Sequence, residues 1–138
     1  YDNLIEEILT FLEAAVERAE NRGVSRAKII VDPGIGFGKT VAHNLLLIKH
    51  LKAFTRLDLP ILIGASRKAF IRKILKGRHD KDIQPDLPIV ENGTQATVAA
   101  AILNGAHIVR VHDVANTIAT VKILDALMDV QDREGMGN

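Results

Sequence analysis

Short apolar segments alternate with helical segments along almost the whole chain. Residues 2–22 carry apolar side chains at helical spacing, and the apolar segments 28–32, 60–64 and 107–112 are each followed by a helical pattern. A helix followed by three strand–helix units with short connections is typical of a parallel α/β protein. Because the strands are almost entirely apolar, both faces of their sheet are expected to be covered. The alternation therefore predicts an α/β fold with three parallel strands and flanking helices.

Polar, glycine and proline residues mark the expected ends of the helices. Asp2 is the candidate N-cap of the first helix and Gly23 its C′ residue, and Asp113 is the candidate N-cap of the last helix. Residues 77–92 are rich in charge and proline and predict a surface loop, so the alanine-rich helix is expected to begin at Thr94. The apolar positions expected to face the core are Leu4, Ile5, Ile8, Leu12, Ala15, Val16, Ala19, Leu47, Leu51, Phe54, Phe70, Ile71, Ile74, Leu75, Val114, Ile118, Val121 and Met128.

The glycine-rich run at residues 31–40 looks like a nucleotide-binding loop but does not meet the pattern of one. A Walker A loop would need glycine at position 33, which is Pro33, and a dinucleotide fingerprint starting at Gly34 would need glycine at position 39, which is Lys39. What remains is a strand that ends in Asp32 and opens into a glycine-rich turn. A buried or half-buried acid there suits the N–H groups of a ligand better than phosphate, although Asp32 could equally be a turn former.

Length and composition exclude several classes of protein. The 138 residues, 47% of them apolar, are enough for one domain with a real core. A net charge of +1 and an aromatic content of 4% argue against a nucleic-acid partner. Without cysteine there is no disulfide or thiolate metal site, and no apolar run approaches the roughly 18 residues of a membrane span. We therefore expect a cytoplasmic protein that does not bind membranes. The start at Tyr1 predicts a processed N-terminus or a piece of a longer chain.

Unusual polar residues follow all three predicted strands. Asp32 ends the first, residues 66–68 (Ser-Arg-Lys) follow the second, and Arg110 and His112 finish the third. Parallel α/β folds place their active sites at these carboxyl ends, so a carboxylate, a lysine, an arginine and a histidine are expected to converge. Within the third strand Arg110 and His112 share one face, and Val109 and Val111 share the other. The acid would bind the N–H edge of a heterocycle, and the arginine and imidazole would bind an anion such as diphosphate.

Four motifs in order resemble the C-terminal part of the dihydropteroate synthase family. They are Asp-Pro-Gly-x-Gly-Phe-Gly-Lys at 32–39, Gly-x-Ser-Arg-Lys at 64–68, Gly-Thr at 93–94 and Arg-Val-His-Asp at 110–113. The pattern alone leaves an open doubly wound sheet and part of a barrel as alternatives. The resemblance implies the C-terminal portion of a (β/α)8 TIM barrel, with residues 1–130 as a partial pterin-binding domain and 131–138 as a polar, disordered tail. A complete barrel takes about 250 residues.

The resemblance also implies the reaction and its ligands. A transferase of folate biosynthesis would join p-aminobenzoate to 6-hydroxymethyl-7,8-dihydropterin diphosphate and release diphosphate, and sulfonamide analogues would compete with p-aminobenzoate. Asp32 would bind the amino-pyrimidine edge of the pterin, and Lys68 its carbonyl and a ring nitrogen. Gly36 and Phe37 would line the p-aminobenzoate pocket, and Ser66 is expected among the substrate-binding residues.

The anion site and the chemistry follow from the same resemblance. Arg110 would stack on the pterin and, with His112, hold the diphosphate, so Lys68, Arg110 and His112 are the expected catalytic residues. Magnesium is the implied cofactor and would neutralise the diphosphate, but no residue of this chain is expected to ligate it. The amine of p-aminobenzoate attacks the methylene carbon, so no protein nucleophile is needed.

Some positions depart from the family pattern. Ala69 and Val90 stand where many members carry a serine and an arginine, and the residues expected from the N-terminal half of the barrel are absent. We therefore expect this chain to be inactive alone. A pterin-dependent methyltransferase barrel and a non-enzymatic fragment are the alternatives, and exposed strand edges predict a homo-oligomer. His43 and Asn44 are expected to cap a helix, and His50, His79 and His107 to be structural or exposed.

Overall fold

Three parallel segments lie side by side at the centre of the molecule. The computed structural model describes residues 2–78 and 81–131. Val31 forms a parallel bridge with Ile61, and β1 (Leu62–Ile63) pairs in parallel with β2 (Ile108–Val109). The hydrogen bonds extend this pairing, because Arg110 N donates to the carbonyl oxygen of Ile63 at 3.0 Å. The three predicted strands are therefore adjacent and parallel, although each is shorter than the sequence pattern predicted.

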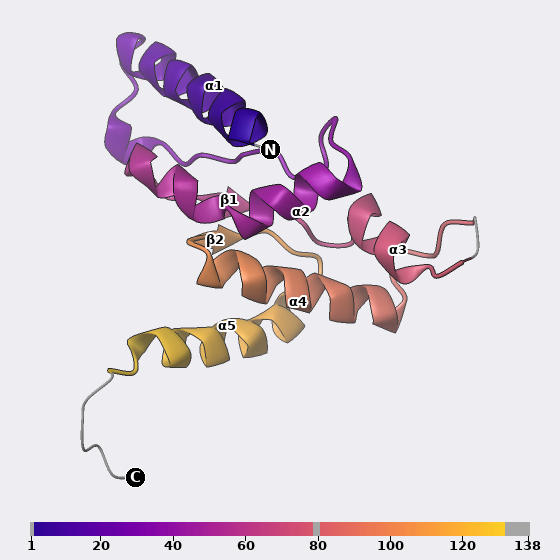
Figure 1. The fold of residues 1–138 in the computed structure, drawn as a ribbon. Helices are drawn as coiled ribbons and strands as arrows, with labels where there is room; N and C mark the ends of the chain where they lie inside the picture. Colours follow the sequence, from indigo (N-terminus) through magenta and orange to yellow (C-terminus); the bar gives the residue numbers. More distant parts are fainter. Residues whose placement is uncertain (1, 79–80, 132–138) are drawn as a thin grey trace.

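Helices cover the strands in an arc (Figure 1). Two of them, α1 and α5, lie at opposite ends of the arrangement, and α4 lies between α5 and α2 and contacts both, together with α3. The residues predicted to line one face of the second helix, Leu47, Leu51 and Phe54, are fully buried. The helical elements are α1 (Asp2–Asn21), η1 (Arg26–Lys28), α2 (Val41–Lys49), η2 (Leu51–Leu57), α3 (Ala69–Leu75), α4 (Pro88–Leu103) and α5 (Val114–Asp129).

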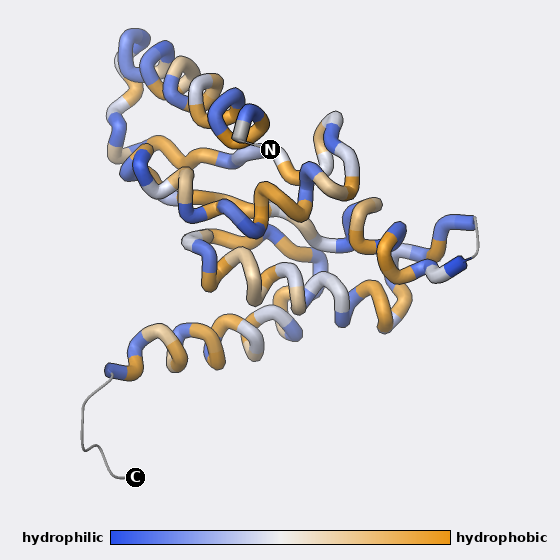
Figure 2. Tube along the Cα trace, viewed as in Figure 1, coloured by the Kyte–Doolittle hydropathy of each residue, from blue (hydrophilic) through white to orange (hydrophobic). Residues whose placement is uncertain are grey.

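The first helix agrees closely with its sequence pattern. It ends as predicted, because Gly23 adopts a φ of 92° and its N–H donates to the Glu20 carbonyl oxygen at 3.0 Å. Apolar and polar residues alternate along it (Figure 2), and its apolar stripe packs against the core. Leu9 is fully buried, although it was not among the expected core positions. The side chain of Asp2, the predicted N-cap, lies outside the described residues.

The first predicted strand is mostly not a strand. Lys28 belongs to the turn η1, and only Val31 makes a bridge. Val31 N donates to the Pro60 carbonyl oxygen at 2.9 Å, and Leu62 N donates to the Val31 carbonyl oxygen at 2.8 Å. Ile30 is 52% exposed, so the prediction of a buried strand over 28–32 is wrong there. The physical reason is that this segment pairs with a described neighbour on one side only.

The fourth α-helix begins earlier than predicted. The sequence placed its start at Thr94, but α4 begins at Pro88, whose fixed φ suits the first turn of a helix. Gly93, expected to precede the helix, lies inside it. A Cβ at Gly93 would lie 2.7 Å from Ile71 Cγ2 and 2.8 Å from Leu75 Cδ1. The glycine therefore lets α4 approach α3 closely, which explains why this residue is tolerated in a helix interior.

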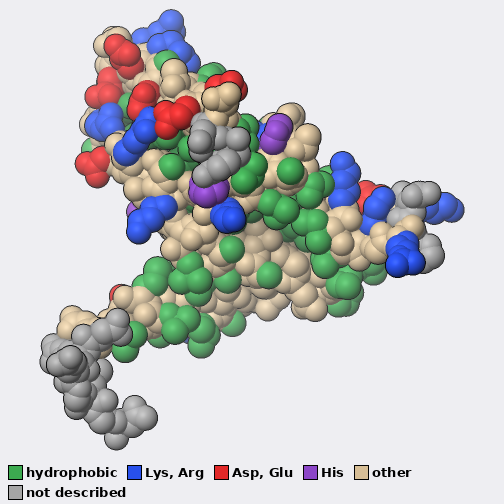
Figure 3. All heavy atoms as spheres, in the orientation of Figure 1, with side chains coloured by type: hydrophobic (Ala, Val, Ile, Leu, Met, Phe, Trp, Pro, Cys, Tyr) green, Lys and Arg blue, Asp and Glu red, His purple; other side chains and the backbone are tan. Residues whose placement is uncertain are grey.

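Helix α5 is capped as predicted but is poorly covered. Asp113 Oδ1 accepts the Asn116 N–H at 2.9 Å, which confirms the N-cap. The expected core positions Val114, Ile118 and Met128 are each about half exposed or more, because α5 packs chiefly on α4. Figure 3 shows hydrophobic side chains gathered over α5, whereas charged side chains gather over α1.

Within residues 2–78 and 81–131, no helix is long and apolar enough to cross a membrane. Of the predicted tail at residues 131–138, all but Gln131 lies outside the described residues.

Candidate active site

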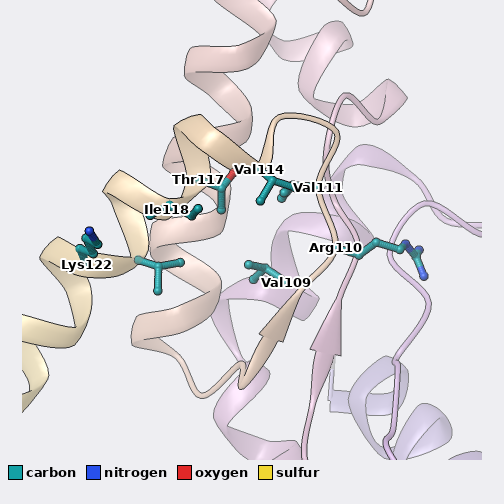
Figure 4. Close-up of a pocket in the computed structure, with 8 residues that line it drawn as sticks. Val109, Arg110, Val111, Val114, Thr117, Ile118 and Lys122 are labelled. Atoms are coloured by element: carbon teal, nitrogen blue, oxygen red, sulfur yellow. The ribbon is translucent and has the colours of Figure 1, made fainter.

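A small pocket of about 140 Å³ lies at the carboxyl ends of β1 and β2. It brings together Lys68, Arg110 and His112, as the sequence predicted. Val109 and Val111 line an apolar groove of about 440 Å³ against α5, which shares Arg110 and Val111 with the small pocket. The side chain of Arg110 points away from the two valines (Figure 4). The predicted facing of the third strand is therefore confirmed for Arg110 and the two valines. The residues that line the small pocket are Gly64, Ser66, Lys68, Arg110, Val111 and His112.

The guanidinium of Arg110 lies directly across the backbone of Gly64. A Cβ at this glycine would overlap Arg110 Nη2 and would lie 2.9 Å from Arg110 Cζ. Only a residue without a side chain leaves this space for the guanidinium. The glycine of the Gly-x-Ser-Arg-Lys motif thus sets where Arg110 can place its donors.

Ser66 contacts His112 twice. Its Oγ lies 2.8 Å from His112 Nδ1, and His112 N donates to the same oxygen at 3.2 Å. Ser66 is buried, whereas the imidazole is exposed. The hydroxyl therefore joins the ends of the second and third strands. Ser66 lines the pocket, but in this structure its hydroxyl is engaged by His112.

Lys68 links the second strand to the glycine-rich loop of the first. Its Nζ donates to the Ile35 carbonyl oxygen at 3.1 Å and lies 4.4 Å from the centre of the Phe37 ring. A Cβ at Gly36, whose φ is 87°, would lie 2.8 Å from Lys68 Cδ. Gly36 and Phe37 therefore frame the lysine from two sides. Phe37 is 67% exposed, so one face of its ring is open to a ligand.

Asp32 acts as a turn former in this structure. Its Oδ1 accepts the Gly34 N–H at 2.8 Å. The side chain is exposed, which corrects the expectation of a buried or half-buried acid, because no described element covers the outer side of the first strand. Asp32 does not line the small pocket, so the four predicted groups converge only in part. In the described residues, Oδ2 accepts no hydrogen bond and stays available to a ligand.

Lys39 completes the glycine-rich loop rather than a phosphate site. Its Nζ donates to the carbonyl oxygens of Gly34 at 2.7 Å and Phe37 at 3.0 Å. Desolvation lowers the pKa of Lys39; the nearby carboxylate of Asp32 opposes this shift, and the charge of Lys68 adds to it. This agrees with the conclusion that residues 31–40 are not a nucleotide-binding loop.

Asn44, in α2, holds the glycine-rich loop in place, a role that the sequence interpretation missed. Its Oδ1 accepts the Gly36 N–H at 2.8 Å, and its Nδ2 donates to the Thr40 carbonyl oxygen at 3.0 Å. Asn44 is buried, and it shares a helix face with Leu47. A polar residue on an apolar helix face was the available signal. The predicted cap at residues 43–44 is three to four residues late, because Thr40 is the N-cap and accepts the His43 N–H.

Replacement of Asn44 by alanine is expected to loosen this loop. Asn44→Ala leaves the Gly36 N–H without its partner, so the free energy of unfolding should fall by about 1–3 kcal/mol. Denaturant unfolding measures this change. The exposed Asn21 provides a matched control, because Asn21→Ala should change the same free energy by less than about 0.5 kcal/mol. Equal stability of the two variants would contradict the structural role of Asn44.

The Gly-Thr motif supports the turn before Lys68. Arg67 has a φ of 57°, which is rare for a non-glycine residue, and its N–H donates to Thr94 Oγ1 at 3.1 Å. Thr94 is fully buried, and Arg67 Nε lies 3.9 Å from Glu91 Oε2 on the same helix. Glu91 was not predicted to take part. Val90, one of the departures from the family pattern, is fully buried in the core.

Among the described histidines outside the pocket, one has a clear structural partner. His107 is structural, because its Nδ1 accepts the Ile61 N–H at 3.1 Å. His79 lies outside the described residues. Across residues 2–78 and 81–131 there is no group of three or more histidine, cysteine or acidic side chains that could hold a metal ion.

Comparison with known proteins decides the family. The family described as pterin binding enzyme matches residues 1–112. The chain belongs to the pterin binding enzyme family.

The similar proteins are named dihydropteroate synthases. The enzyme of Synechocystis sp. is 46% identical over 127 residues, which are 92% of this chain and 42% of the relative. The structure of the Yersinia pestis enzyme with a pterine-sulfa conjugate matches with a TM-score of 0.85 and 35% identity, over 94% of this chain and 48% of that chain. The Xanthomonas albilineans enzyme in complex with 7,8-dihydropteroate matches with a TM-score of 0.84 and 34% identity, over 95% and 47%.

These matches confirm the predicted C-terminal portion of a (β/α)8 barrel and exclude the open doubly wound sheet. The chain spans less than half the length of each of these relatives. The strand-end pocket and the glycine-rich loop therefore represent part of a barrel mouth.

Proposed function

We propose that this chain supplies the pterin- and diphosphate-binding side of a dihydropteroate synthase barrel. The complete enzyme would join p-aminobenzoate to 6-hydroxymethyl-7,8-dihydropterin diphosphate and release diphosphate. The observation that carries this proposal is the convergence of Lys68, Arg110 and His112 in one pocket at the carboxyl ends of adjacent parallel strands. Three cationic or hydrogen-bonding groups in so small a space suit a compact, highly charged anion.

The pterin and p-aminobenzoate would bind on the side of the glycine-rich loop. The free Oδ2 of Asp32 would accept the amino and ring N–H groups of the pterin, and Lys68 would turn from the Ile35 carbonyl to the pterin carbonyl. Phe37 would contact the ring of p-aminobenzoate, or of a sulfonamide analogue, with its exposed face. Gly36 leaves room for a flat ligand beside the lysine, because a side chain there would collide with Lys68.

The chemistry needs leaving-group stabilisation more than a protein nucleophile. As the C–O bond to diphosphate breaks, its electron pair leaves with the diphosphate and the methylene carbon gains positive charge. Arg110 and His112 would donate hydrogen bonds to that growing negative charge. The amine of p-aminobenzoate forms the new C–N bond and then loses one proton to solvent. Each step uses substrate atoms and the donors of the pocket.

Magnesium, the cofactor implied by the resemblance, does not fit the donor set of this chain. The pocket is lined by cationic groups, which repel a divalent cation, and the exposed Asp32 is outside it. We propose that any magnesium that accompanies the diphosphate takes its protein ligands from residues other than those described. The steps above therefore do not use it.

Two alternatives stand beside this proposal. A methyltransferase barrel of the same family would not need three anion-binding groups at the strand ends, so the pocket favours a substrate with a diphosphate leaving group. A non-enzymatic fragment would keep the pocket only as a remnant. A cytoplasmic location stays a prediction from the absence of cysteine.

The pocket assignment is tested by filling the space that Arg110 occupies. Gly64→Ala should displace the guanidinium and weaken binding of inorganic pyrophosphate by about tenfold, because one charge-assisted contact is lost. The free energy of unfolding should change by less than about 1 kcal/mol, since the clash falls on the flexible end of a side chain. Calorimetric titration and denaturant unfolding measure the two quantities.

The control for this test is a double-mutant cycle. In an Arg110→Ala background, Gly64→Ala should cause no further loss of pyrophosphate affinity. If Gly64→Ala weakens binding equally in both backgrounds, the glycine does not act through Arg110.

We further propose that the chain self-associates through α5. Ile123 and Leu127 on this helix are both more than half exposed, and exposed apolar patches mark interaction sites. Light scattering should find a mass of more than one chain, and Leu127→Glu should shift it toward the monomer. Lys122→Glu, at an exposed polar position of the same helix, should shift it less. A monodisperse monomer of the unmodified chain would contradict the proposal.

A further inference from the structure

The two hydrogen bonds between Ser66 and His112 restrict where the imidazole can carry its proton. Ser66 Oγ accepts the backbone N–H of His112, so one lone pair of the hydroxyl oxygen is already used. The same oxygen lies 2.8 Å from His112 Nδ1. A hydroxyl has one hydrogen to donate, and a neutral imidazole has one N–H donor and one acceptor nitrogen. The direction of the second bond therefore determines the tautomer.

Only one direction satisfies every group. If Nδ1–H donated to Ser66, the hydroxyl would accept twice, and its own hydrogen would have no acceptor in the described part of the chain. Ser66 is only 6% exposed, so water is a poor substitute, and an unsatisfied buried donor is costly. If the hydroxyl donates to Nδ1, both residues are satisfied. The proton of neutral His112 then resides on Nε2.

Nε2 is the nitrogen that a ligand can reach. The exposed imidazole lines the pocket beside Lys68 and Arg110, and no hydrogen bond from the described residues engages Nε2. An Nε2–H group gives an anionic oxygen a hydrogen-bond donor. The opposite tautomer would present a lone pair to that oxygen and repel it.

We propose that Ser66 is a positioning residue that holds His112 in the Nε2–H tautomer, so that the imidazole offers an N–H donor to an oxyanion in the pocket. The identity of that anion as diphosphate rests on the proposed function, whereas the tautomer does not. Ser66 therefore acts through His112, which differs from the direct substrate contact that the sequence predicted for it.

If Ser66→Ala lets the proton divide evenly between the two nitrogens, apparent anion affinity falls by only about twofold. A spectroscopic readout is therefore more decisive than affinity.

The test is long-range ¹H–¹⁵N correlation NMR of the full chain at about pH 8.5, where histidine side chains are ordinarily neutral. The His112 signals are assigned by their loss in His112→Gln. The unmodified chain should show a single Nε2–H tautomer, Ser66→Ala an averaged pattern, and Ser66→Thr, which keeps the hydroxyl, the original pattern. A proton on Nδ1 or an averaged pattern in the unmodified chain overturns the proposal, as does an unchanged pattern in folded Ser66→Ala. The spectrum of the unmodified chain can overturn the proposal even if the alanine variant does not fold.

Titration of the same samples with inorganic pyrophosphate separates this inference from the proposed function. A single Nε2–H tautomer that is lost in Ser66→Ala, together with absent pyrophosphate binding, would confirm the positioning role and contradict the diphosphate site. Pyrophosphate binding to a chain with the proton on Nδ1 would support the anion site and contradict the positioning role of Ser66. If Ser66 only connected the two strand ends, the loss of its hydroxyl would not change the tautomer of His112.

Discussion

The chain alone is expected to form 7,8-dihydropteroate at least about 1,000-fold more slowly than an intact dihydropteroate synthase, because removal of even one preorganised donor costs about 100- to 1,000-fold. The structure gives the reason. Asp32, Arg110 and His112 are all exposed, so water screens the charges that the reaction depends on. In addition, Val31 pairs with a described neighbour on one side only, so the described residues border the site on one side of the first strand alone. A product-release assay with purified chain and both substrates measures the rate.

Reconstitution provides the control for this prediction. Addition of a polypeptide that carries the preceding segment of the Synechocystis sp. relative should raise the rate, because that segment would supply the other side of the barrel mouth. The same addition to Arg110→Ala should raise it far less. Turnover of the isolated chain at the rate of an intact enzyme would contradict the conclusion that it carries only part of the site.

Arg110→Ala is expected to cause the largest loss of anion binding among single substitutions in the chain. The guanidinium is held over Gly64 in the pocket with Lys68 and His112, where it can donate two parallel hydrogen bonds. Hydrogen bonds to charged groups contribute about 1.5–3 kcal/mol, so pyrophosphate affinity should fall by roughly 10- to 150-fold. Calorimetric titration at fixed ionic strength measures the affinity, since salt screens such contacts.

The matched control for Arg110 is Arg22, an exposed arginine after α1 and outside the pocket. Arg22→Ala removes the same charge from the chain but should leave pyrophosphate affinity within about twofold, because the exposed charge lies outside the pocket and is screened by solvent. Equal losses in the two variants would mean that the anion responds to net charge rather than to the pocket.

The strand ends could be predicted from the sequence because two simple rules act there. Side chains alternate along a strand, which put Arg110 on the face opposite Val109 and Val111, and parallel strands end at the same edge, where Arg110 and His112 share a pocket. Both rules depend on local spacing, which the sequence contains. The positions of these side chains therefore agree with the prediction even though the regular strands are only two residues long.

The contacts that support the site could not be predicted, because they depend on how elements far apart in the sequence pack against one another. Asn44 looked like a capping residue, and only packing of α2 against the glycine-rich loop reveals that it holds Gly36. Gly93 looked like a helix boundary, since its close contact with α3 has no signal in the local sequence. The burial of Asp32 was overestimated because covered strands were assumed on both sides. Local patterns thus located the groups but not their partners.

Calorimetric titration of a pterin diphosphate analogue tests the central claim most directly, with the unmodified chain and Asp32→Ala compared under the same conditions. A chain that carries the proposed pterin-binding side of the site should bind the analogue saturably at one site per chain, and Asp32→Ala should weaken binding by roughly tenfold or more, since the proposed charged hydrogen-bond partner of the pterin is lost. Absence of saturable binding to the unmodified chain, or the same affinity in Asp32→Ala, would contradict the assignment.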